Sequence, residues 1–184
     1  MLNNLRELGC FVLDADKTAR DVVEPGQPAF NDIVSSFGDG VVAADGTLDR
    51  ARLGEIVFND TVKRELLNSI VHPRVIEAQD RWLREAEQAQ PDGIAVVDAA
   101  LMIESGGYKR FDKLIVVWCE PAVQLERLMT RNGLDETEAR KRIAAQMSQE
   151  EKKSYADFLI DTSGSREDTG HQTVEVFDQL KLLG

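Results

Sequence analysis

The sequence predicts an α/β fold: a parallel sheet with helices on both of its faces. Four short apolar runs, at residues 11–13, 94–97, 114–118 and 158–160, are continuous rather than alternating, which is typical of strands buried on both faces. Helical patterns separate these runs, as right-handed crossovers between parallel strands require. The length of 184 residues and a hydrophobic fraction of 42% fit one globular domain over residues 1–184.

The composition excludes several classes of function. The net charge of −11 argues against general nucleic-acid binding, because phosphate backbones repel an acidic surface. No segment approaches the length of a membrane-spanning helix, and residues 1–9 are too polar for a signal peptide, so we expect a cytoplasmic protein without a membrane partner. Cys10 and Cys119 flank apolar runs and are expected to be buried, reduced thiols. The composition leaves the oligomeric state open.

The interval between the first two predicted strands is mostly helical. Asp60 is a candidate N-cap for a helix that His72-Pro73 interrupts, with Pro73 in the first turn of the next helix. This insertion, about residues 25–92, is expected to form a substrate-covering sub-domain, although a plain helical layer on the sheet would have the same pattern. The helices expected here cover residues 29–37, 50–58, 60–70 and a stretch from residue 73 onwards.

Two further helices are expected after the third predicted strand. The first covers residues 121–132 and ends at Gly133, and Asp135 begins the second. Two helices joined by a short turn can swing over a nucleotide, so residues 121–150 are expected to form a lid. A final amphipathic helix is expected at about residues 167–183.

Two aspartates follow the first predicted strand. Asp14 and Asp16 end the segment FVLDAD, and Arg20 follows on a helical pattern. Ligands of parallel α/β sheets bind outside the carboxyl ends of the strands, where carboxylates can orient a hydroxyl, accept its proton or hold a hydrated Mg²⁺. One of the two aspartates could instead cap the next helix, and the segment alone leaves these alternatives open.

The second predicted strand also ends in an acid. Asp98 occupies the place where phosphoryl-transfer sites hold Mg²⁺ through water, and Glu104 follows within two turns. His72 could bind a substrate, although a histidine before a proline is more often structural.

Four arginines gather on the predicted lid of this acidic chain. The planar guanidinium fork of arginine matches phosphate oxygens, so the cluster indicates a phosphate site. The alternative is a solvated face with salt bridges inside the lid, and the spacing alone does not decide between them. The arginines are Arg127, Arg131, Arg140 and Arg142, and the candidate acidic partners are Glu126, Glu136 and Glu138.

These segments together resemble the dephospho-CoA kinase family nearly from end to end. No single motif is specific, but the order and spacing of so many segments are. The matching segments are LGCFVLDADKTARDVVEPGQPAF, FGDGVVAADGTLDRARLGEIVFND, LLNSIVHPRV, VVDAALMIESGGY, VQLERLMTRNGL, RIAAQM and ADFLIDTSGS. The resemblance implies a P-loop kinase fold and transfer of the ATP γ-phosphate to the ribose 3′-hydroxyl of dephospho-CoA, the last step of coenzyme A synthesis, with Mg²⁺ as cofactor.

The resemblance also implies roles for the candidate residues. Asp16 orients or deprotonates the hydroxyl, and Asp14 supports it or the hydrated Mg²⁺, which Asp98 contacts through water. Arg127 and Arg131 close over the phosphates and neutralise developing charge. The remaining residues implied to bind the acceptor are Arg20, Arg50, His72 and Glu104, and those implied to bind the nucleotide with the two catalytic arginines are Arg142 and Gln146.

The sequence departs from the family pattern at three places. Ala100 stands where the family commonly has Pro, and Thr162 stands where Asn is usual, which puts a base contact there in doubt. Family members begin with an apolar strand and a P-loop, G-x-x-x-x-G-K-[ST], and no such loop occurs in the 184 residues. Loss of a buried strand with four apolar side chains would cost roughly 6–12 kcal/mol, so we expect a poorly stable chain without kinase turnover on its own.

A misplaced start codon or truncated gene model is the simplest explanation for the missing loop, and an in-frame upstream translation would test it. Two other functions stay open. One is a kinase of the same fold with another small-molecule acceptor. The other is a non-catalytic remnant that binds dephospho-CoA without ATP hydrolysis.

Overall fold

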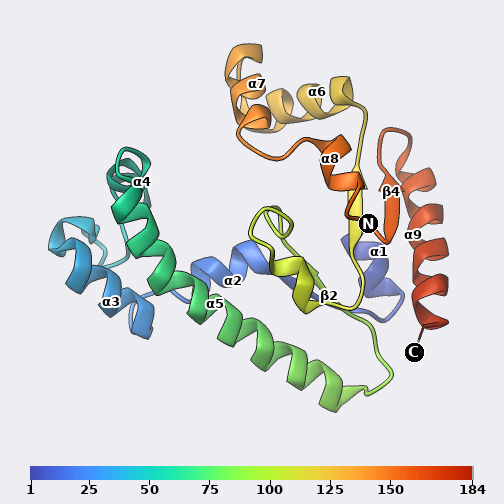
Figure 1. The fold of residues 1–184 in the computed structure, drawn as a ribbon, viewed down its shortest axis with the longest axis horizontal. Helices are drawn as coiled ribbons and strands as arrows, with labels where there is room; N and C mark the ends of the chain where they lie inside the picture. The colour runs from blue at the N-terminus through green and yellow to red at the C-terminus, as the bar shows by residue number, and fades with distance from the viewer. Residues whose placement is uncertain (184) are drawn as a thin grey trace. The chain divides into compact units, whose positions relative to one another are not determined.

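The computed structural model describes residues 1–183, in which helices alternate with short parallel strands (Figure 1). The chain divides into two compact units: residues 11–99 form one, and residues 1–10 with 100–184 form the other. The expected sub-domain, residues 25–92, lies inside the first of these units, and the expected lid, residues 121–150, lies inside the second.

The unit of residues 11–99 contains two parallel strands. Strand β1 (Phe11–Asp14) pairs with β2 (Ala95–Asp98) in a register that runs from Phe11↔Ala95 to Asp14↔Asp98. The short helix α2 (Ala15–Asp21) begins directly after β1. The carboxyl ends of both strands therefore carry an aspartate, and these two aspartates occupy paired positions at the same end of the sheet.

The helical part of this unit has the elements that the sequence predicts. Helix α3 (Pro28–Phe37) ends at Gly38, which has a φ of 82°, a value that glycine adopts without steric cost. Helix α4 (Arg50–Phe58) has the predicted bounds. The 3₁₀ turn η1 (Asp39–Val41) connects them. Their apolar faces enclose a small core, which consists of Val23, Ala29, Ile33, Val41, Leu48 and Leu53.

The prediction of a helix break at His72-Pro73 is wrong. Helix α5 runs without interruption over Thr61–Ala89, with Pro73 in its interior and Asp60 as its N-cap. An interior proline removes one backbone hydrogen bond and crowds the preceding turn. Helix α5 packs on α2, α3 and α4, and this tertiary packing holds the helix together across the proline.

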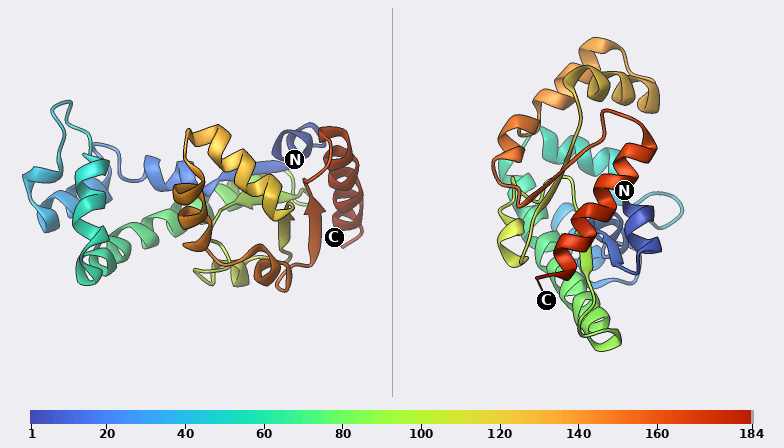
Figure 2. Two further views of the ribbon diagram at one scale, coloured as in Figure 1. Left: turned by 90° about the horizontal axis from the view of Figure 1, so that it is seen from above. Right: turned by 90° about the vertical axis from the view of Figure 1, so that its right-hand side faces the viewer.

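The other unit contains the second pair of parallel strands. Strand β3 (Ile115–Trp118) pairs with β4 (Phe158–Asp161) from Ile115↔Phe158 to Trp118↔Asp161. Helix α9 (Arg166–Lys181) lies along β4 and also contacts α1 (Leu2–Glu7) (Figure 2). A 3₁₀ turn, η2 (Gly107–Arg110), precedes β3.

Three helices connect β3 to β4. Helix α6 (Pro121–Asn132) ends at Gly133 in the left-handed conformation, and α7 (Glu136–Ala144) packs back on α6. The Asp135 side chain caps α7 by accepting the N–H of Glu138 at 2.8 Å. Helix α8 (Gln149–Lys153) was not expected from the sequence, although Ser148 is a typical N-cap residue.

The strands are less buried than their apolar runs predict. Within residues 1–183, Val116 and Ile160 are buried, whereas the other strand residues are half-buried or exposed. Each described sheet has two strands, so each strand has one hydrogen-bonded neighbour and one open edge. The prediction that the strands are buried on both faces therefore holds only in part, because most strand residues are half-buried, while their parallel pairing is confirmed.

Replacing Ile160 by Ala is expected to lower the free energy of unfolding by about 2–5 kcal/mol, because its side chain is 0% exposed and its removal leaves a cavity. The neighbouring Leu159 is 46% exposed, so Leu159→Ala is the matched control and should cost much less. Urea unfolding of the purified variants measures both values. Equal losses for the two variants would contradict the burial of Ile160.

Candidate active site

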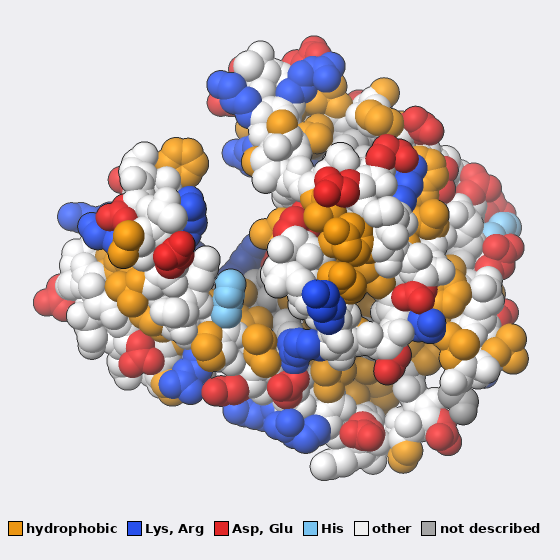
Figure 3. All heavy atoms as spheres, in the orientation of Figure 1, with side chains coloured by type: hydrophobic (Ala, Val, Ile, Leu, Met, Phe, Trp, Pro, Cys, Tyr) orange, Lys and Arg blue, Asp and Glu red, His pale blue; other side chains and the backbone are white. Residues whose placement is uncertain are grey.

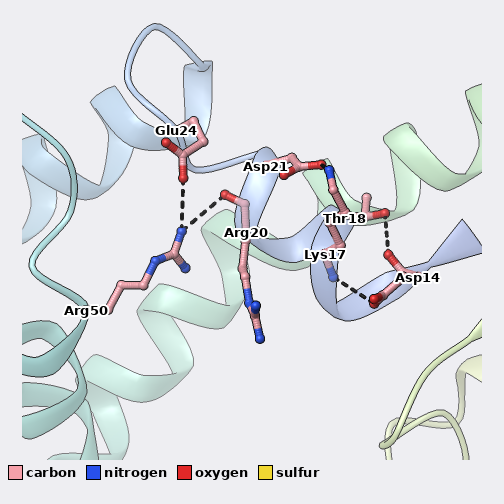
Figure 4. A network of polar contacts seen from close by, with 7 residues as sticks. All are labelled: Asp14, Lys17, Thr18, Arg20, Asp21, Glu24 and Arg50. Atoms are coloured by element: carbon pink, nitrogen blue, oxygen red, sulfur yellow. Dashed lines mark hydrogen bonds and ion pairs between the residues drawn. The ribbon is translucent and has the colours of Figure 1, made fainter.

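Asp14 serves as the N-cap of helix α2 (Figure 4). Its Oδ1 accepts the backbone N–H of Lys17 at 2.9 Å, and its carbonyl oxygen accepts the hydroxyl of Thr18 at 3.0 Å. The capping role that the sequence left open is thus correct for Asp14. Because Asp14 lies opposite Asp98 across the β1–β2 pair, its carboxylate stays at the strand edge while it caps the helix.

Asp16 lies in the first turn of α2 and is exposed. Unlike Asp14, whose oxygen is occupied by a backbone N–H, Asp16 takes no part in capping. Its carboxylate is therefore accessible to an external hydroxyl.

Arg50 connects helix α4 to the end of α2. Its Nη2 donates to the carbonyl oxygen of Arg20 and to Oε1 of Glu24, each at 3.3 Å, and Figure 4 shows the Arg20 guanidinium directed away from this contact. The contact thus joins Arg50 to the backbone of Arg20 and not to its guanidinium group. His72 is exposed on α5, and its role in acceptor binding stays a prediction.

The acids at the β1–β2 edge are compatible with a nucleotide-bound Mg²⁺. Among the residues that the structure describes, no three His, Cys, Asp or Glu side chains form a metal-binding group. Mg²⁺ in phosphoryl-transfer sites usually takes one or two carboxylates, with phosphate oxygens and water completing its shell. The strand register pairs Asp14 with Asp98, and their role in holding Mg²⁺ stays a prediction.

A cavity of about 1070 Å³ opens beside helices α6 and α7. All four residues predicted to bind the nucleotide, namely Arg127, Arg131, Arg142 and Gln146, line it, together with Cys119 and Ser163 near the ends of the strands. Figure 3 shows Lys and Arg side chains over this pair of helices, at the top of the view. The volume and the positive lining suit an anion of nucleotide size.

The arginine cluster is divided between two surfaces. Arg140 pairs with Glu136 at 2.7 Å and lines a separate groove on the α6–α7 hairpin. The salt-bridge alternative is therefore correct for Arg140. Within residues 1–183, no carboxylate forms a salt bridge with Arg127, Arg131 or Arg142. The carboxylate of Glu126 also lines the cavity, so the lining carries three positive charges and one negative charge.

Helix α8 supplies contacts that the sequence did not predict. Gln149 accepts the backbone N–H of Cys119 at 2.9 Å through Oε1 and donates to Oε1 of Gln124 at 2.7 Å through Nε2. Cys119 and Gln124 both line the cavity. Gln149 therefore ties one wall of the cavity to α8, and the Ser148 N-cap followed by acidic residues is the sequence signal that could have located this helix.

Glu104 pairs with Lys152 of α8 at 2.9 Å and accepts the backbone N–H of Met147 at 3.2 Å. Partial burial pushes the pKa of the Glu104 carboxyl upward, but the hydrogen bond and the charge of Lys152 outweigh it, so the pKa lies below its ordinary value. Glu104 thus has a structural contact that the sequence did not predict. Its role in substrate binding stays a prediction.

The stability of the chain is expected to depend on pH through Glu104. Because its pKa is depressed in the folded chain, its contribution is present above the ordinary glutamate pKa and is lost as the pH falls through the folded-state value. Glu104→Gln should lower the unfolding free energy by about 1.5–3 kcal/mol at neutral pH, and by much less at acidic pH. Glu150→Gln, at a carboxylate that is 82% exposed, is the control. An equal loss at both pH values would contradict this assignment.

No helix of residues 1–183 combines the length and apolar character needed to cross a bilayer.

Parallel strands that end in acids, together with an arginine-lined cavity beside paired helices, define a phosphotransferase of the P-loop kinase fold. The family model for dephospho-CoA kinase matches residues 1–168. The chain therefore belongs to the dephospho-CoA kinase family.

Individual relatives agree with the family match. The chain is 45% identical to a dephospho-CoA kinase of Leifsonia xyli over 97% of this chain and 90% of the relative. It is equally similar, at 45%, to a dephospho-CoA kinase of Geobacillus kaustophilus, with 97% and 89% covered.

Solved structures show the same fold. TT1252 from Thermus thermophilus superposes with a TM-score of 0.79 at 28% identity, covering 97% of this chain and 89% of that one. A dephospho-CoA kinase from Campylobacter jejuni superposes with a TM-score of 0.72 at 27% identity, covering 98% and 89%.

Proposed function

We propose that the residues of this chain serve transfer of the ATP γ-phosphate to the ribose 3′-hydroxyl of dephospho-CoA. The observation that carries the proposal is the cavity lined by Arg127, Arg131 and Arg142, none of which forms a salt bridge with a described carboxylate, although the chain has a net charge of −11. These three guanidinium groups outnumber the one carboxylate in the lining, that of Glu126, so the cavity favours an anion. Membership of the dephospho-CoA kinase family supports a nucleoside triphosphate as this anion.

Asp16 is the proposed base of this reaction. The 3′-hydroxyl gives its proton to the Asp16 carboxylate while the oxygen attacks the γ-phosphorus. The bond from the γ-phosphorus to the bridging oxygen breaks, and ADP leaves with that oxygen. The exposed position of Asp16 in the first turn of α2 supports this role, since a base must reach the proton that it accepts.

Mg²⁺ is proposed as the cofactor. Asp14 and Asp98 would hold it, directly or through water, and the ion would offset negative charge on the phosphates. Arg20, Arg50 and His72 are proposed to orient the acceptor, and their positions on α2, α4 and α5 support a shared role for the helical part of residues 11–99. A cytoplasmic location accompanies this proposal and is supported by two free cysteines, Cys10 and Cys119.

We expect acceptor binding and turnover to depend on different parts of the protein. The 184 residues contain no G-x-x-x-x-G-K-[ST] segment, whose amides and lysine hold the transferred phosphate in P-loop kinases. We expect this chain to bind dephospho-CoA in calorimetry and to release no ADP when ATP is added. A loop-bearing form, in which such a strand and loop are fused ahead of residue 1, should release ADP in the same coupled assay.

The assay also decides between the proposed reaction and its alternatives. Binding of dephospho-CoA without turnover in either form favours a non-catalytic acceptor-binding module. Turnover of the loop-bearing form with a nucleoside monophosphate, but not with dephospho-CoA, would identify a different small-molecule kinase. The absence of binding to either ligand would contradict the proposal.

A further inference from the structure

We propose that Thr162 is a positioning residue that directs the Arg127 guanidinium toward the nucleotide. This inference rests on the proposed function, because it assigns a task to one arginine of the same cavity. Thr162 directly follows strand β4, and Arg127 lies on helix α6. Two hydrogen bonds join them across 35 residues of sequence.

In this contact Arg127 donates both hydrogen bonds and Thr162 accepts them. The hydroxyl of Thr162 donates its proton to the carbonyl oxygen of Trp118 at 2.9 Å, so its oxygen is available to accept. Arg127 donates from Nη1 to this oxygen at 3.3 Å and from Nη2 to the Thr162 carbonyl oxygen at 2.7 Å. Because a hydroxyl has a single proton, the bond to Trp118 fixes the hydroxyl as an acceptor for the guanidinium.

Thr162, which holds Arg127, is bonded to the β3–β4 sheet. The backbone N–H of Thr162 also bonds to the Trp118 carbonyl at 2.8 Å, which extends the β3–β4 ladder. The preceding Asp161 bonds in both directions with the Gln172 side chain of α9, at 2.8 and 2.9 Å. Thr162 therefore belongs to a rigid element, whereas Arg127 is a long, exposed side chain that would otherwise populate several rotamers.

The arrangement leaves part of the guanidinium free for a ligand. An arginine has five N–H donors, and the bonds to Thr162 use two of them. Arg131 and Arg142 line the same cavity. The two oxygens of Thr162 hold the Arg127 guanidinium at the cavity wall before an anion arrives, which lowers the ordering cost of binding.

The first test measures the contact itself in the chain as it exists. Phenylglyoxal modifies arginine side chains, and peptide mapping by mass spectrometry gives the rate for each residue. Thr162→Val removes the hydroxyl but keeps the branched shape, so Arg127 should react several-fold faster. Thr162→Ser keeps the hydroxyl and should retain the original rate. Arg131, which bonds to neighbouring Asn132, is the internal control.

Equal Arg127 rates in the original chain and in Thr162→Val would overturn the inference. A matching increase at Arg131 would also overturn it, because it would indicate general loosening of the cavity. Thr137→Val, at an exposed threonine of α7 that does not line the cavity, should leave both rates unchanged.

The second test measures the consequence for the nucleotide. In the loop-bearing form, Thr162→Val should raise the KM for ATP by about 2- to 12-fold, the cost of ordering one long side chain, and change kcat less. Thr162→Val should add nothing in an Arg127→Ala background, because Thr162 acts through Arg127. An unchanged KM, or an additive effect, contradicts the inference. Failure of the unsubstituted loop-bearing form to bind ATP contradicts the proposed function instead, and the labelling rates then decide the inference alone.

Discussion

Replacing Asp16 by Asn in the loop-bearing form is expected to lower turnover by about 10²–10⁴-fold, the usual contribution of a general base. Asparagine keeps the size and polarity of the side chain but cannot accept the proton of the 3′-hydroxyl. ATP binding should stay nearly unchanged, because the proposed nucleotide contacts come from the cavity beside α6 and α7. Steady-state kcat and a calorimetric ATP affinity measure the two effects separately.

One variant of the same helix, Asp21→Asn, serves as the control, and Asp14→Asn tests the proposed Mg²⁺ ligand. Asp21 lies at the other end of α2 and pairs with Lys17 at 2.6 Å, so Asp21→Asn should leave turnover close to that of the unsubstituted protein. Asp14→Asn keeps an effective N-cap and removes only the charge, so its loss of turnover reports on Mg²⁺ rather than on folding. Unchanged turnover of Asp16→Asn would remove Asp16 from the mechanism.

Replacing Arg131 by Ala is expected to lower turnover of the loop-bearing form by about 10³–10⁵-fold, the range for an arginine that neutralises transition-state charge in phosphoryl transfer. Arg131 lines the cavity and forms no salt bridge with a described carboxylate. Its charge is therefore available for the phosphates. Arg131→Lys keeps the charge without the planar fork and should recover only part of the lost turnover.

Arg140 is the matched control for this prediction. It belongs to the same pair of helices, α6 and α7, but pairs with Glu136 on its own helix and lines a different groove. Arg140→Ala should change turnover little, because an exposed pair of this kind contributes at most about 1 kcal/mol. Equal losses for the two variants would indicate that overall lid charge, rather than the cavity, governs the reaction.

The helices were predictable where their signals are local. The bounds of α4 agree with the prediction, and Asp60 and Asp135 cap the helices assigned to them, because a capping bond joins residues three positions apart. The uninterrupted α5 was not predictable. Its continuity across Pro73 depends on three packed helices, and residue-by-residue propensity contains no information about such neighbours.

The candidate site likewise has features that the sequence predicts and features that only the structure shows. The sequence by itself determined the family, the parallel strands ending in aspartates and the arginine-rich pair of helices α6 and α7, because these depend on residue type and spacing. Only the tertiary structure decided that Arg142 lines the cavity while Arg140 does not, and that Thr162 holds Arg127. Helical periodicity places side chains on different faces, but the partner that covers each face comes from distant parts of the chain, and a spacing pattern does not specify it.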